Sequence, residues 1–337
     1  MTAGPYGQAM PRLAVAMTPQ RAADVCSPAT RRLLADRFDV VWAGEVLDGT
    51  ALERLIAGSD VVLTSWGTPH LDAGLWRDGR GPSVVAHAAG SVKKLIDPRV
   101  LDHGVAVFSA AGRIARSVGE YCLAAMLTLA RRLPQFDETV RAGEWKPGHL
   151  RGHEISGRAV GVLGAGATAR ALISLLVPFG CDVVVHDPYL DAERAAALGV
   201  RKVTPAEAMA CPIVSVHLPD LPQTRGLVSA ELIERLPDGA IFVNSSRGPA
   251  VDQEALLEHV VAGRVLAALD VYDPEPPRLT AAQLTAPNLL LTPHIAGDTT
   301  EGHLALAGHV MADVLAWLDH GVRGPGFVDP ATWAIAA

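Results

Sequence analysis

The sequence predicts an α/β protein in which two doubly wound parallel sheets form two domains. Short apolar runs, typical of buried strands, alternate with segments whose apolar residues recur at helical spacing. This alternation indicates βαβ units. One series of units fills roughly residues 10–112, and a second begins at Ala159. A helical pattern returns over 301–317, after the second series has ended, so the second domain is predicted to be inserted into the first.

The predicted boundaries follow from this insertion. Residues 1–112 and 298–337 are expected to form the first domain, and residues 113–297 the second. The chain then crosses between the domains near 111–117 and near 297–300. We expect these two segments to act as hinges.

Each series is expected to supply the strands of one sheet. In the first domain, we predict strands at 12–17, 38–42, 60–64, 83–86 and 105–108, and helices at 29–36, 52–57 and 93–101. In the second domain, we predict strands at 159–163, 181–186, 213–217, 240–244, 265–269 and 288–291, and helices at 167–176, 191–197, 229–236 and 253–262.

The most regular helical pattern of the chain lies between the two series. Apolar residues recur at three- and four-residue spacing over 116–133, and Pro134 is expected to end this helix. Residues 136–157 lack such a pattern and contain Trp145, Pro147 and several glycines. A loop of this length inside a compact domain needs a reason, and packing against a second subunit would supply one.

Composition and charge restrict the class of protein. The 337 residues are enough for two domains with separate cores. A net charge of −7 disfavours nucleic acid, which is held mainly by clustered Lys and Arg. The longest apolar candidate, 121–130, is too short to span a bilayer, and no basic segment precedes a sustained apolar core near the N-terminus. We therefore expect a cytoplasmic protein with neither nucleic-acid nor membrane partners.

The cysteines show neither a disulfide framework nor the spacing of a metal site. They are scattered along the chain without a C-x-x-C pair. Each is expected to be a small buried apolar residue, and no metal is predicted. The four are Cys26, Cys122, Cys181 and Cys211.

A glycine turn opens the second series. The apolar strand 159–163 ends at Gly164-Ala165-Gly166, and a helical pattern follows at once. Gly164 allows a sharp turn, Gly166 lets a pyrophosphate approach the main chain, and the N–H groups that open the helix supply donors at the positive end of its dipole. The third glycine of the usual G-x-G-x-x-G motif is Ala169, a tolerated variant. Taken alone, the motif also fits an ordinary strand-to-helix turn.

Asp187 makes the glycine turn more specific. It ends the next strand, 21 residues beyond Gly166, at the spacing from which a carboxylate reaches the ribose hydroxyls of a dinucleotide. A carboxylate there would repel a 2′-phosphate, so NAD is favoured over NADP. The second domain is therefore predicted to be a Rossmann domain that binds NAD.

Three chemically matched residues follow strand ends in the second domain. Arg247 lies in VNSSRGPAVD, Glu275 in LDVYDPEPP and His294 in LTPHIAG. Doubly wound sheets bind their ligands at this edge. A guanidinium can bind a carboxylate through two donors and polarise the adjoining carbonyl. An imidazole can protonate the oxygen while a carboxylate beside it fixes its tautomer and favours its charged form, so the set suits 2-oxo acid chemistry.

Each of these residues also has an ordinary structural interpretation. Taken singly, Arg247 suits a surface salt bridge, His294 a hydrogen-bonded structural histidine and Glu275 a solvated carboxylate. Downstream of a dinucleotide fold, the structural interpretation would need three coincidences.

The chain resembles the D-isomer-specific 2-hydroxyacid dehydrogenases over nearly its whole length. The motifs HLP, VNSSRG, LDVYDPEP and PHIAG, together with Thr224 and the VD of residues 251–252, stand in that family's order and spacing. The resemblance implies a Rossmann domain inserted into a flavodoxin-like substrate domain, and an NAD-dependent oxidoreductase that interconverts a small 2-oxo acid and a D-2-hydroxy acid. It implies the catalytic set Arg247, Glu275 and His294.

The resemblance also implies the residues around the ligands. The NAD site would comprise Gly164, Gly166, Ala167, Thr168, Asp187, His217, Leu218, Pro219, Thr224, Ser245, Asp270, His294 and Gly297. Within it, Asp270 and the Ser245 carbonyl would hold the nicotinamide carboxamide, and residues 217–219 would wall the adenosine. In the segment HAAGSVKKLID, the N–H groups of Gly90 and Ser91 would bind the substrate carboxylate beside Arg247. Residues 116–157 resemble the family's dimerisation region and imply a homodimer.

The chain departs from the family pattern at two loops. Many members carry arginine and an apolar residue where this chain has Ala167 and Thr168, which puts one pyrophosphate contact in doubt. The loop 90–94 carries Ser91 and two lysines that would suit an acidic or phosphorylated substrate, although solvated helix charges are the simpler interpretation. Trp66 follows a strand and is expected either to wall the substrate pocket or to pack in the core.

Two alternatives to a 2-hydroxyacid dehydrogenase are open at this point. A phosphite-type dehydrogenase on the same scaffold is compatible with the three catalytic residues, although its expected lysine is Ala89 here. A formate-type enzyme is disfavoured because it carries glutamine at the position of Glu275. An NADH-sensing regulatory protein is the alternative from another class, and the complete catalytic set weighs against it.

Overall fold

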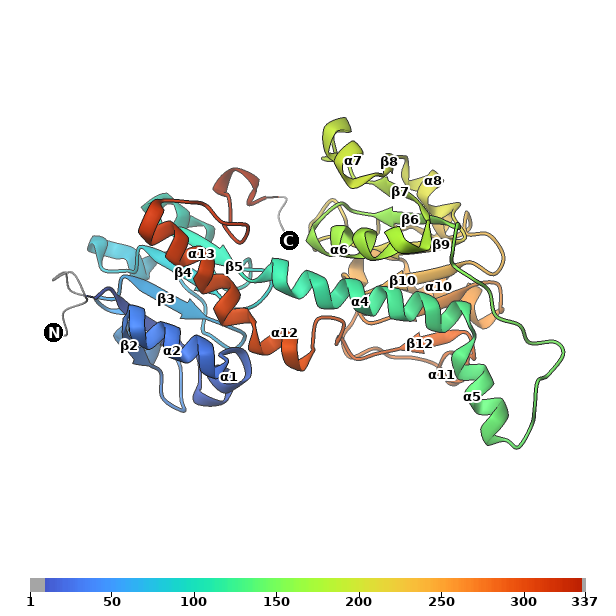
Figure 1. Cartoon of the computed structure of the whole chain (residues 1–337), viewed down its shortest axis with the longest axis horizontal. Helices are drawn as coiled ribbons and strands as arrows, with labels where there is room; N and C mark the ends of the chain where they lie inside the picture. The colour runs from blue at the N-terminus through green and yellow to red at the C-terminus, as the bar shows by residue number, and fades with distance from the viewer. Residues whose placement is uncertain (1–9, 335–337) are drawn as a thin grey trace. The chain divides into compact units, whose positions relative to one another are not determined.

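The computed structural model describes residues 10–334, which divide into two compact units (Figure 1). The first unit holds the described residues up to Ile114 and from Asp298 onward, and the second is Ala115–Gly297. Each unit contains one parallel sheet, so the predicted α/β fold is confirmed. In the part of the chain that is described, no helix is both long enough and apolar enough to cross a membrane.

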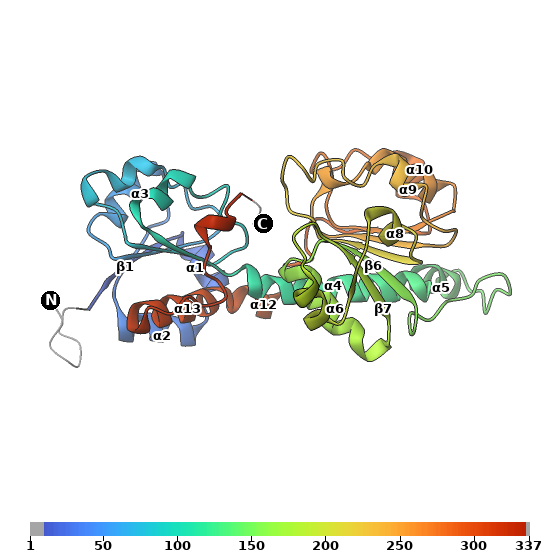
Figure 2. The same cartoon turned by 90° about the horizontal axis from the view of Figure 1, so that it is seen from above.

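The first unit is built around a five-stranded sheet covered on both faces. In spatial order its strands are β2 (Asp39–Trp42), β1 (Arg12–Ala16), β3 (Val61–Thr64), β4 (Val84–His87) and β5 (Ala106–Ser109). Successive side chains of a strand point to opposite faces, so Leu13 and Val15 join one buried cluster while Ala14 and Ala16 join the other. Figure 2 shows helices on the two sides of this sheet.

The two covering layers of the first unit come from different parts of the chain. One face is covered by α1 (Pro19–Val25), α2 (Pro28–Arg37) and α13 (Leu306–His320). The other is covered by α3 (Gly49–Ile56) and the 3₁₀ segments η1 (Ala73–Gly79) and η2 (Pro98–His103). The short helix α12 (Thr300–Leu304) precedes α13, and η5 (Pro330–Thr332) follows it. The C-terminal segment therefore completes the core that the N-terminal segment begins.

The second unit contains a seven-stranded parallel sheet. In spatial order its strands are β12 (Leu289–Leu291), β11 (Leu266–Leu269), β10 (Ile241–Asn244), β9 (Ile213–Val216), β6 (Ala159–Leu163), β7 (Asp182–His186) and β8 (Arg201–Lys202). Its helices and 3₁₀ segments are α4 (Ala111–Ala130, which starts in the first unit), α5 (Leu133–Arg141), α6 (Ala167–Leu176), η3 (Val177–Phe179), α7 (Ala192–Leu198), α8 (Pro205–Met209), α9 (Ala230–Ile233), η4 (Gly248–Ala250), α10 (Gln253–Val261) and α11 (Ala281–Leu284).

The strand order of the second sheet reverses beside β6. This strand pairs with β7 on one side and with β9 on the other, so successive connections leave it in opposite directions. In open α/β sheets, ligands bind outside the carboxyl ends of the strands at such a switch point. The glycine turn after β6 and the HLP segment after β9 border this point.

Two glycines let elements of the second unit approach backbone to backbone. A Cβ at Gly161 would lie 2.0 Å from the carbonyl oxygen of Ala208, so α8 packs directly on β6. A Cβ at Gly119 would lie 3.0 Å from Ala171, so α4 and α6 also approach closely. Side chains at these positions would force the layers apart at a cost of about 1–3 kcal/mol.

The helix predicted at 116–133 has different ends in the structure. It begins at Ala111 and stops at Ala130, so the predicted hinge segment 111–117 is helical. Pro134 does not end it but lies in the first turn of α5, where its missing N–H is not needed. Arg132, with φ of 53°, separates the two helices. The segment 136–157 is therefore not irregular throughout.

Two other predicted helices are also corrected. Residues 93–101 do not form an α-helix, because the Asp97 side chain accepts a hydrogen bond from the Arg99 N–H and starts the 3₁₀ segment η2. The helix predicted at 301–317 is interrupted at Ala305, between α12 and α13.

Three short helices were missed by the sequence prediction. These helices, α1, α8 and α11, are each capped by a threonine side chain. In α8 and α11 the cap is a complete capping box, Thr204 with Glu207 and Thr280 with Gln283. These caps were a usable sequence signal, but helices of four to seven residues are too short to show apolar periodicity.

Candidate active site

The glycine turn has the backbone geometry that the sequence predicts. Gly164 has φ of 101°, and a Cβ there would lie 2.5 Å from the carbonyl oxygen of His217, so only glycine fits. Nothing lies within 4 Å of the position of a Cβ on Gly166. Gly166 is the N-cap residue of α6, and no side chain caps the helix. The first N–H groups of α6 are therefore suited to bind an anion from outside.

Asp187 lies beside this turn because β7 is the neighbour of β6. Its Oδ2 accepts a hydrogen bond of 2.7 Å from the Ala165 N–H, and its Oδ1 accepts one of 2.8 Å from the Tyr189 N–H. The carboxylate is only half-buried, so it is in reach of a ligand. The turn, the free helix start and the carboxylate together fit an adenine dinucleotide.

Thr168 is tied to the neighbouring strand through a buried histidine. Its Oγ1 lies 3.0 Å from His217 Nδ1, and His217 Nε2 lies 3.0 Å from Ser215 Oγ. Burial lowers the pKa of His217 from 6.5 to about 4, so the ring is neutral at physiological pH. Thr168, a departure from the family pattern, therefore links the first turn of α6 to β9.

The remaining residues predicted to wall the adenosine lie in one compact loop. Leu218 is buried and Pro219 half-buried. The Thr224 hydroxyl bonds within this loop, accepting from the Leu221 N–H at 3.1 Å and donating to the carbonyl of Pro219 or of Leu221. Thr224 therefore holds the shape of the loop.

The structure brings the three predicted catalytic residues to neighbouring strand ends. Arg247 follows β10, Glu275 follows β11 and His294 follows β12, and these strands are adjacent in the sheet. His294 Nδ1 lies 2.9 Å from Glu275 Oε2, and Glu275 Oε1 accepts a hydrogen bond of 3.1 Å from the Tyr272 N–H. The carboxylate thus fixes the imidazole through Nδ1 and leaves Nε2 for another partner.

The environment of Glu275 favours its ionised form. Partial burial alone would raise the pKa of Glu275, but the hydrogen bonds from His294 and Tyr272 and the positive charges of His294 and Arg247 outweigh it. The net effect is a lowered pKa. A carboxylate at this position stabilises positive charge on the imidazole.

The loop that carries Arg247 is held by its own hydrogen bonds. Asn244 Nδ2 donates to the Arg247 carbonyl at 3.1 Å, and Asn244 Oδ1 accepts from the N–H and hydroxyl of Ser246. A Cβ at Gly248 would lie 2.0 Å from the main chain of Tyr272, so this loop packs directly on the segment that leads to Glu275. The guanidinium is half-buried, and its Nη1 donates to the Ser246 carbonyl at 2.6 Å.

The residues predicted near the nicotinamide carboxamide are mostly engaged within the protein. Asp270 is fully buried, and its carboxylate accepts hydrogen bonds from Thr292 Oγ1, the Ile295 N–H and the Ala296 N–H. Ser245 Oγ lies 3.0 Å from Cys122 Sγ. Gly297 is half-buried at the end of the unit.

The predicted substrate loop belongs to the first unit. Gly90 and Ser91 follow β4, and within the described chain neither of their N–H groups donates a hydrogen bond to another protein group. Ser65 Oγ donates to the Ala88 carbonyl at 2.9 Å and ties this loop to the one that follows β3. Two backbone donors are therefore available after β4 for a carboxylate.

Trp66 is not a core residue. Its side chain is 39% exposed, the His303 ring centroid lies 5.1 Å away, and the Arg21 guanidinium lies 5.5 Å from its ring centroid. This exposure excludes the alternative of a packed core tryptophan, and Trp66 lies directly after β3.

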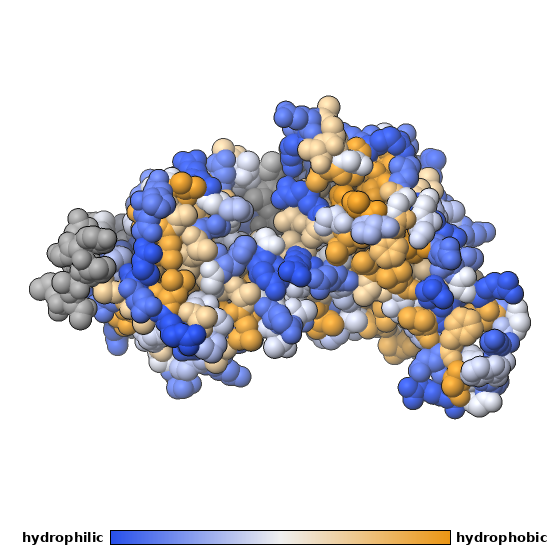
Figure 3. Space-filling model, viewed as in Figure 1, coloured by the Kyte–Doolittle hydropathy of each residue, from blue (hydrophilic) through white to orange (hydrophobic). Residues whose placement is uncertain are grey.

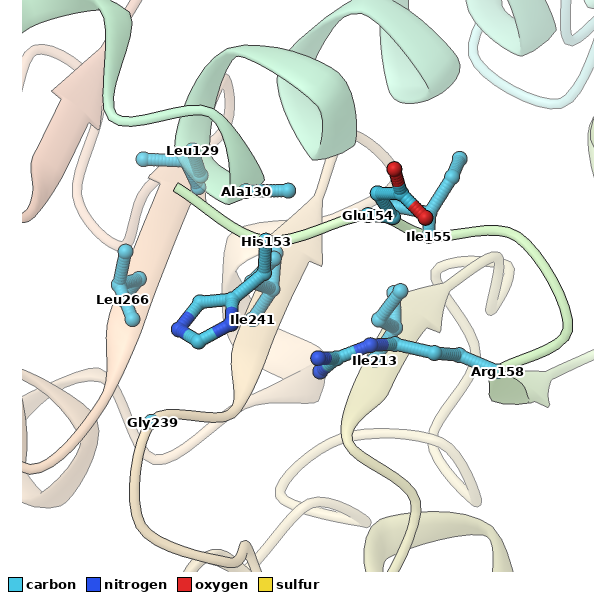
Figure 4. A pocket seen from close by; sticks show the side chains of 10 residues that line it. All are labelled: Leu129, Ala130, His153, Glu154, Ile155, Arg158, Ile213, Gly239, Ile241 and Leu266. Atoms are coloured by element: carbon cyan, nitrogen blue, oxygen red, sulfur yellow. The ribbon is translucent and has the colours of Figure 1, made fainter. Parts of the chain in front are cut away.

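A separate hollow lies at the opposite edge of the second sheet (Figure 4). With an internal volume of about 10 Å³ it has room for about one water molecule. It is lined by residues at the amino ends of β9, β10 and β11 and by the segment before β6. The hollow is therefore not part of the predicted site. Among the described residues there is also no cluster of His, Cys, Asp or Glu that could hold a metal ion.

The family assignment rests on the second unit. Residues 123–296 match the family model described as "D-isomer specific 2-hydroxyacid dehydrogenase, NAD binding domain". The chain belongs to this family. NAD is accordingly its cofactor, and the resemblance in the sequence motifs is confirmed.

Individual relatives in this family cover different shares of the chain. D-3-phosphoglycerate dehydrogenase of Mycobacterium tuberculosis is 32% identical over 314 residues, covering 87% of this chain and 58% of that protein. This chain therefore spans little more than half the length of that relative. Hydroxypyruvate reductase of Thermotoga maritima is 29% identical over 274 residues, covering 80% of this chain and 88% of that one.

A solved structure shows the same fold. The glyoxylate reductase from Paecilomyes thermophila superposes with a TM-score of 0.76 at 22% identity, covering 96% of this chain and 99% of that one.

Some residues that hold the site were not predicted from the sequence. Tyr121, Tyr272 and Thr292 bond to one another or to the segments that carry Glu275 and His294. Tyr272 stands in the motif LDVYDPEP and Thr292 stands two residues before His294 in LTPHIAG, so both had a motif position, whereas Tyr121 lies on the helix predicted at 116–133.

The neutral state of His217 predicts a specific pH dependence of stability. Its pKa in the folded protein, about 4, lies below its ordinary value of 6.5, so between these pH values the unfolded chain binds a proton that the folded chain does not. The free energy of unfolding should therefore decrease as the pH falls from 6.5 to 4. Buried His87, whose pKa is also lowered to about 4, acts in the same direction.

Urea unfolding at a series of pH values measures this effect. His217→Gln should reduce the acid-dependent loss of stability, whereas the control His320→Gln, at an exposed helix end, should leave it unchanged. An unaltered pH dependence in His217→Gln would contradict the assignment of a buried neutral ring.

The first turn of α6 predicts a gain in cofactor affinity from one added charge. Ala167→Arg places a guanidinium beside the free N–H groups of the helix start, where a pyrophosphate is expected. We expect the Kd for NADH to fall by about three- to tenfold. Fluorescence titration with NADH measures it, with Ala167→Gln as the neutral control of similar length. Equal or weaker binding in Ala167→Arg would show that the pyrophosphate does not lie there.

Proposed function

We propose that this protein is an NAD-dependent oxidoreductase that interconverts a small 2-oxo acid and the corresponding D-2-hydroxy acid. The observation that carries the proposal is the His294–Glu275 pair, 2.9 Å apart, beside Arg247 on three adjacent strand ends of an NAD-binding unit. An arginine, an acid and a histidine together supply a carboxylate anchor and a proton donor, the two functions that reduction of a 2-oxo acid requires.

The three side chains have distinct tasks in this reaction. Arg247 binds the substrate carboxylate through its guanidinium and polarises the neighbouring carbonyl. His294 donates its Nε2 proton to the carbonyl oxygen, so that an alcohol forms and the imidazole becomes neutral. Glu275 holds Nδ1 and stabilises the charged ring before the transfer. Bound NADH supplies the hydride that reduces the carbonyl carbon, and the oxidation direction reverses each of these steps.

The substrate acid is proposed from the predicted substrate loop and from the relatives. The free N–H groups of Gly90 and Ser91 provide donors for a carboxylate, and Trp66 offers an apolar wall after the neighbouring strand. One relative is named a hydroxypyruvate reductase and another a D-3-phosphoglycerate dehydrogenase. Hydroxypyruvate is therefore the first acid to assay, followed by glyoxylate, pyruvate and phosphorylated acids.

The role of His294 predicts that one substitution lowers turnover while it leaves the affinity for the cofactor nearly unchanged. His294→Ala removes the proton donor, so kcat with the best 2-oxo acid should fall by about 10²- to 10⁴-fold. The Kd for NADH should change by less than about twofold, because α6 and Asp187 hold the other half of the cofactor. Steady-state kinetics and NADH titration measure the two quantities, with His320→Ala at an exposed helix end as the control.

Two results would argue against the proposed function. Wild-type turnover in His294→Ala would remove this residue from the mechanism. Tight NADH binding by the wild-type protein without turnover of any acid in the panel would favour the NADH-sensing alternative, and turnover of phosphite would favour the phosphite-type enzyme.

We also infer that the protein acts as a homodimer through the segment around α5. This helix buries none of its residues, and Leu133, Val140 and Trp145 are 53%, 57% and 76% exposed. Figure 3 shows hydrophobic residues among hydrophilic ones in this segment, at the lower right. Several exposed aromatic and aliphatic side chains within one short segment are typical of a surface that a partner covers. A second copy is the partner that the resemblance of residues 116–157 to a dimerisation region implies.

Light scattering on the purified protein tests the homodimer. We expect a dimer at micromolar concentration, and Trp145→Glu should shift the equilibrium towards the monomer because it places a charge in an apolar interface. Val46→Glu, at an exposed apolar residue of the first unit, is the matched control and should stay dimeric. A wild-type monomer, or a Trp145→Glu variant as dimeric as the control, would contradict this interface.

A further inference from the structure

A buried carboxylate holds the two residues that follow His294. Asp270 Oδ1 accepts a hydrogen bond of 2.8 Å from the Ile295 N–H, and Oδ2 accepts one of 2.8 Å from the Ala296 N–H. Asp270 itself is fully buried directly after β11. The main chain on the C-terminal side of His294 is thus attached to the interior of the unit.

His294 needs this attachment because its own backbone is strained. Its φ of 59° lies in the left-handed region, which costs a non-glycine residue about 1 kcal/mol or more. Its side chain is 52% exposed, so packing alone does not fix the ring. A strained backbone persists only where the surrounding contacts determine it.

The Asp270 carboxylate is in turn connected to helix α4. Thr292 Oγ1 donates a hydrogen bond of 2.6 Å to Asp270 Oδ1, and Tyr121 OH lies 2.6 Å from Thr292 Oγ1. A carboxylate only accepts, so the single hydroxyl proton of Thr292 points to Asp270. The Tyr121 hydroxyl must therefore be the donor to Thr292. The hydroxyl groups of Tyr121 and Thr292 therefore form one series of hydrogen bonds, in which Tyr121 donates to Thr292 and Thr292 donates to Asp270. This series connects α4 to the loop of His294.

Helix α4, which carries Tyr121, is firmly packed in the second unit. It is 20 residues long, and Val118, Cys122 and Met126 of the same helix are buried. The neighbour of Tyr121, Cys122, contacts Ser245 in the loop after β10. Burial raises the pKa of Tyr121, and the charge of Asp270 raises it further, so the phenol keeps its proton.

We propose that Tyr121 is a positioning residue for the reaction, acting through Thr292 and Asp270 to fix the backbone that aims His294. The proposal rests on the proposed function, because it gives His294 the task of proton donor. Tyr121 touches neither substrate nor cofactor in this account. Its hydroxyl completes the donor set of the carboxylate that holds residues 295 and 296.

The test compares variants that remove or keep single hydroxyl groups. Tyr121→Phe and Thr292→Val break the chain at different links, whereas Thr292→Ser keeps the hydroxyl. Thr285→Val, which removes a hydroxyl bonded within the exposed helix α11, is the matched control. Each variant is assayed for kcat and KM with the best 2-oxo acid, for the Kd of NADH, and for amide hydrogen exchange over residues 292–297.

We expect Tyr121→Phe to lower kcat about tenfold, because small misplacement of a catalytic group is costly, while the Kd for NADH changes by less than about twofold. Thr292→Val should lower kcat at least as much as Tyr121→Phe does. The double variant should have a kcat no lower than that of Thr292→Val alone, because both substitutions break the same series of hydrogen bonds. Thr292→Ser and Thr285→Val should keep kcat near that of the wild type. Exchange at Ile295 and Ala296 should be faster in Tyr121→Phe and Thr292→Val only.

Three outcomes would overturn the proposal. These are wild-type kcat in Tyr121→Phe, additive losses in the double variant, and unchanged exchange at residues 295 and 296. If the wild-type protein turns over none of the acids, the proposed function fails, and the exchange measurement still decides whether Tyr121 holds this loop. If Tyr121→Phe does not fold, the comparison of Thr292→Val with Thr292→Ser decides it.

Discussion

The candidate site depends on a negative charge that the protein buries. Moving a carboxylate out of water costs several kcal/mol unless hydrogen bonds replace its hydration. Asp270 accepts three such bonds, and no salt bridge involves it in the described part of the chain. The polar groups that compensate it come from a single segment, residues 292–296. The hydrogen bonds that compensate the Asp270 carboxylate are therefore the same bonds that hold the loop of residues 292–296. Loss of the carboxylate would release the loop, and a change in the loop would leave the carboxylate without its donors.

The sequence was sufficient to predict the parts of the candidate site that depend only on residue type and on position after a strand. Parallel strands end at one edge of the sheet, so Arg247, Glu275 and His294 could be expected together once their strands were recognised. The turn at Gly164 was predictable for a similar reason, because a positive φ and a close carbonyl exclude every other residue. In both cases a local rule determines the residue.

The sequence was insufficient to predict the role of a residue that acts through a partner far away in the sequence. Tyr121 looked like one apolar position of a helical stripe, and its hydrogen bond to Thr292 joins residues 171 positions apart. No periodicity or motif contains such a contact, because it depends on how α4 packs on the sheet. The same applies to Thr168, whose bond to His217 spans 49 positions and gives a structural task to a residue that the sequence placed only in the predicted NAD site. Pro134 was misread for a different reason, since a proline is compatible with a helix start as well as with a helix end.

The start of α6 carries Ala167, Thr168 and Ala169, none of them charged, above a neutral His217. A pyrophosphate at this point would be attracted by aligned N–H dipoles, which belong to the backbone and cannot move away from it. The attraction of a helix start for an anion is screened by dissolved salt and acts only over the first turn. Recognition of a dinucleotide at this turn would thus depend on the position of the main chain, and its strength would decrease as the ionic strength of the surroundings rises.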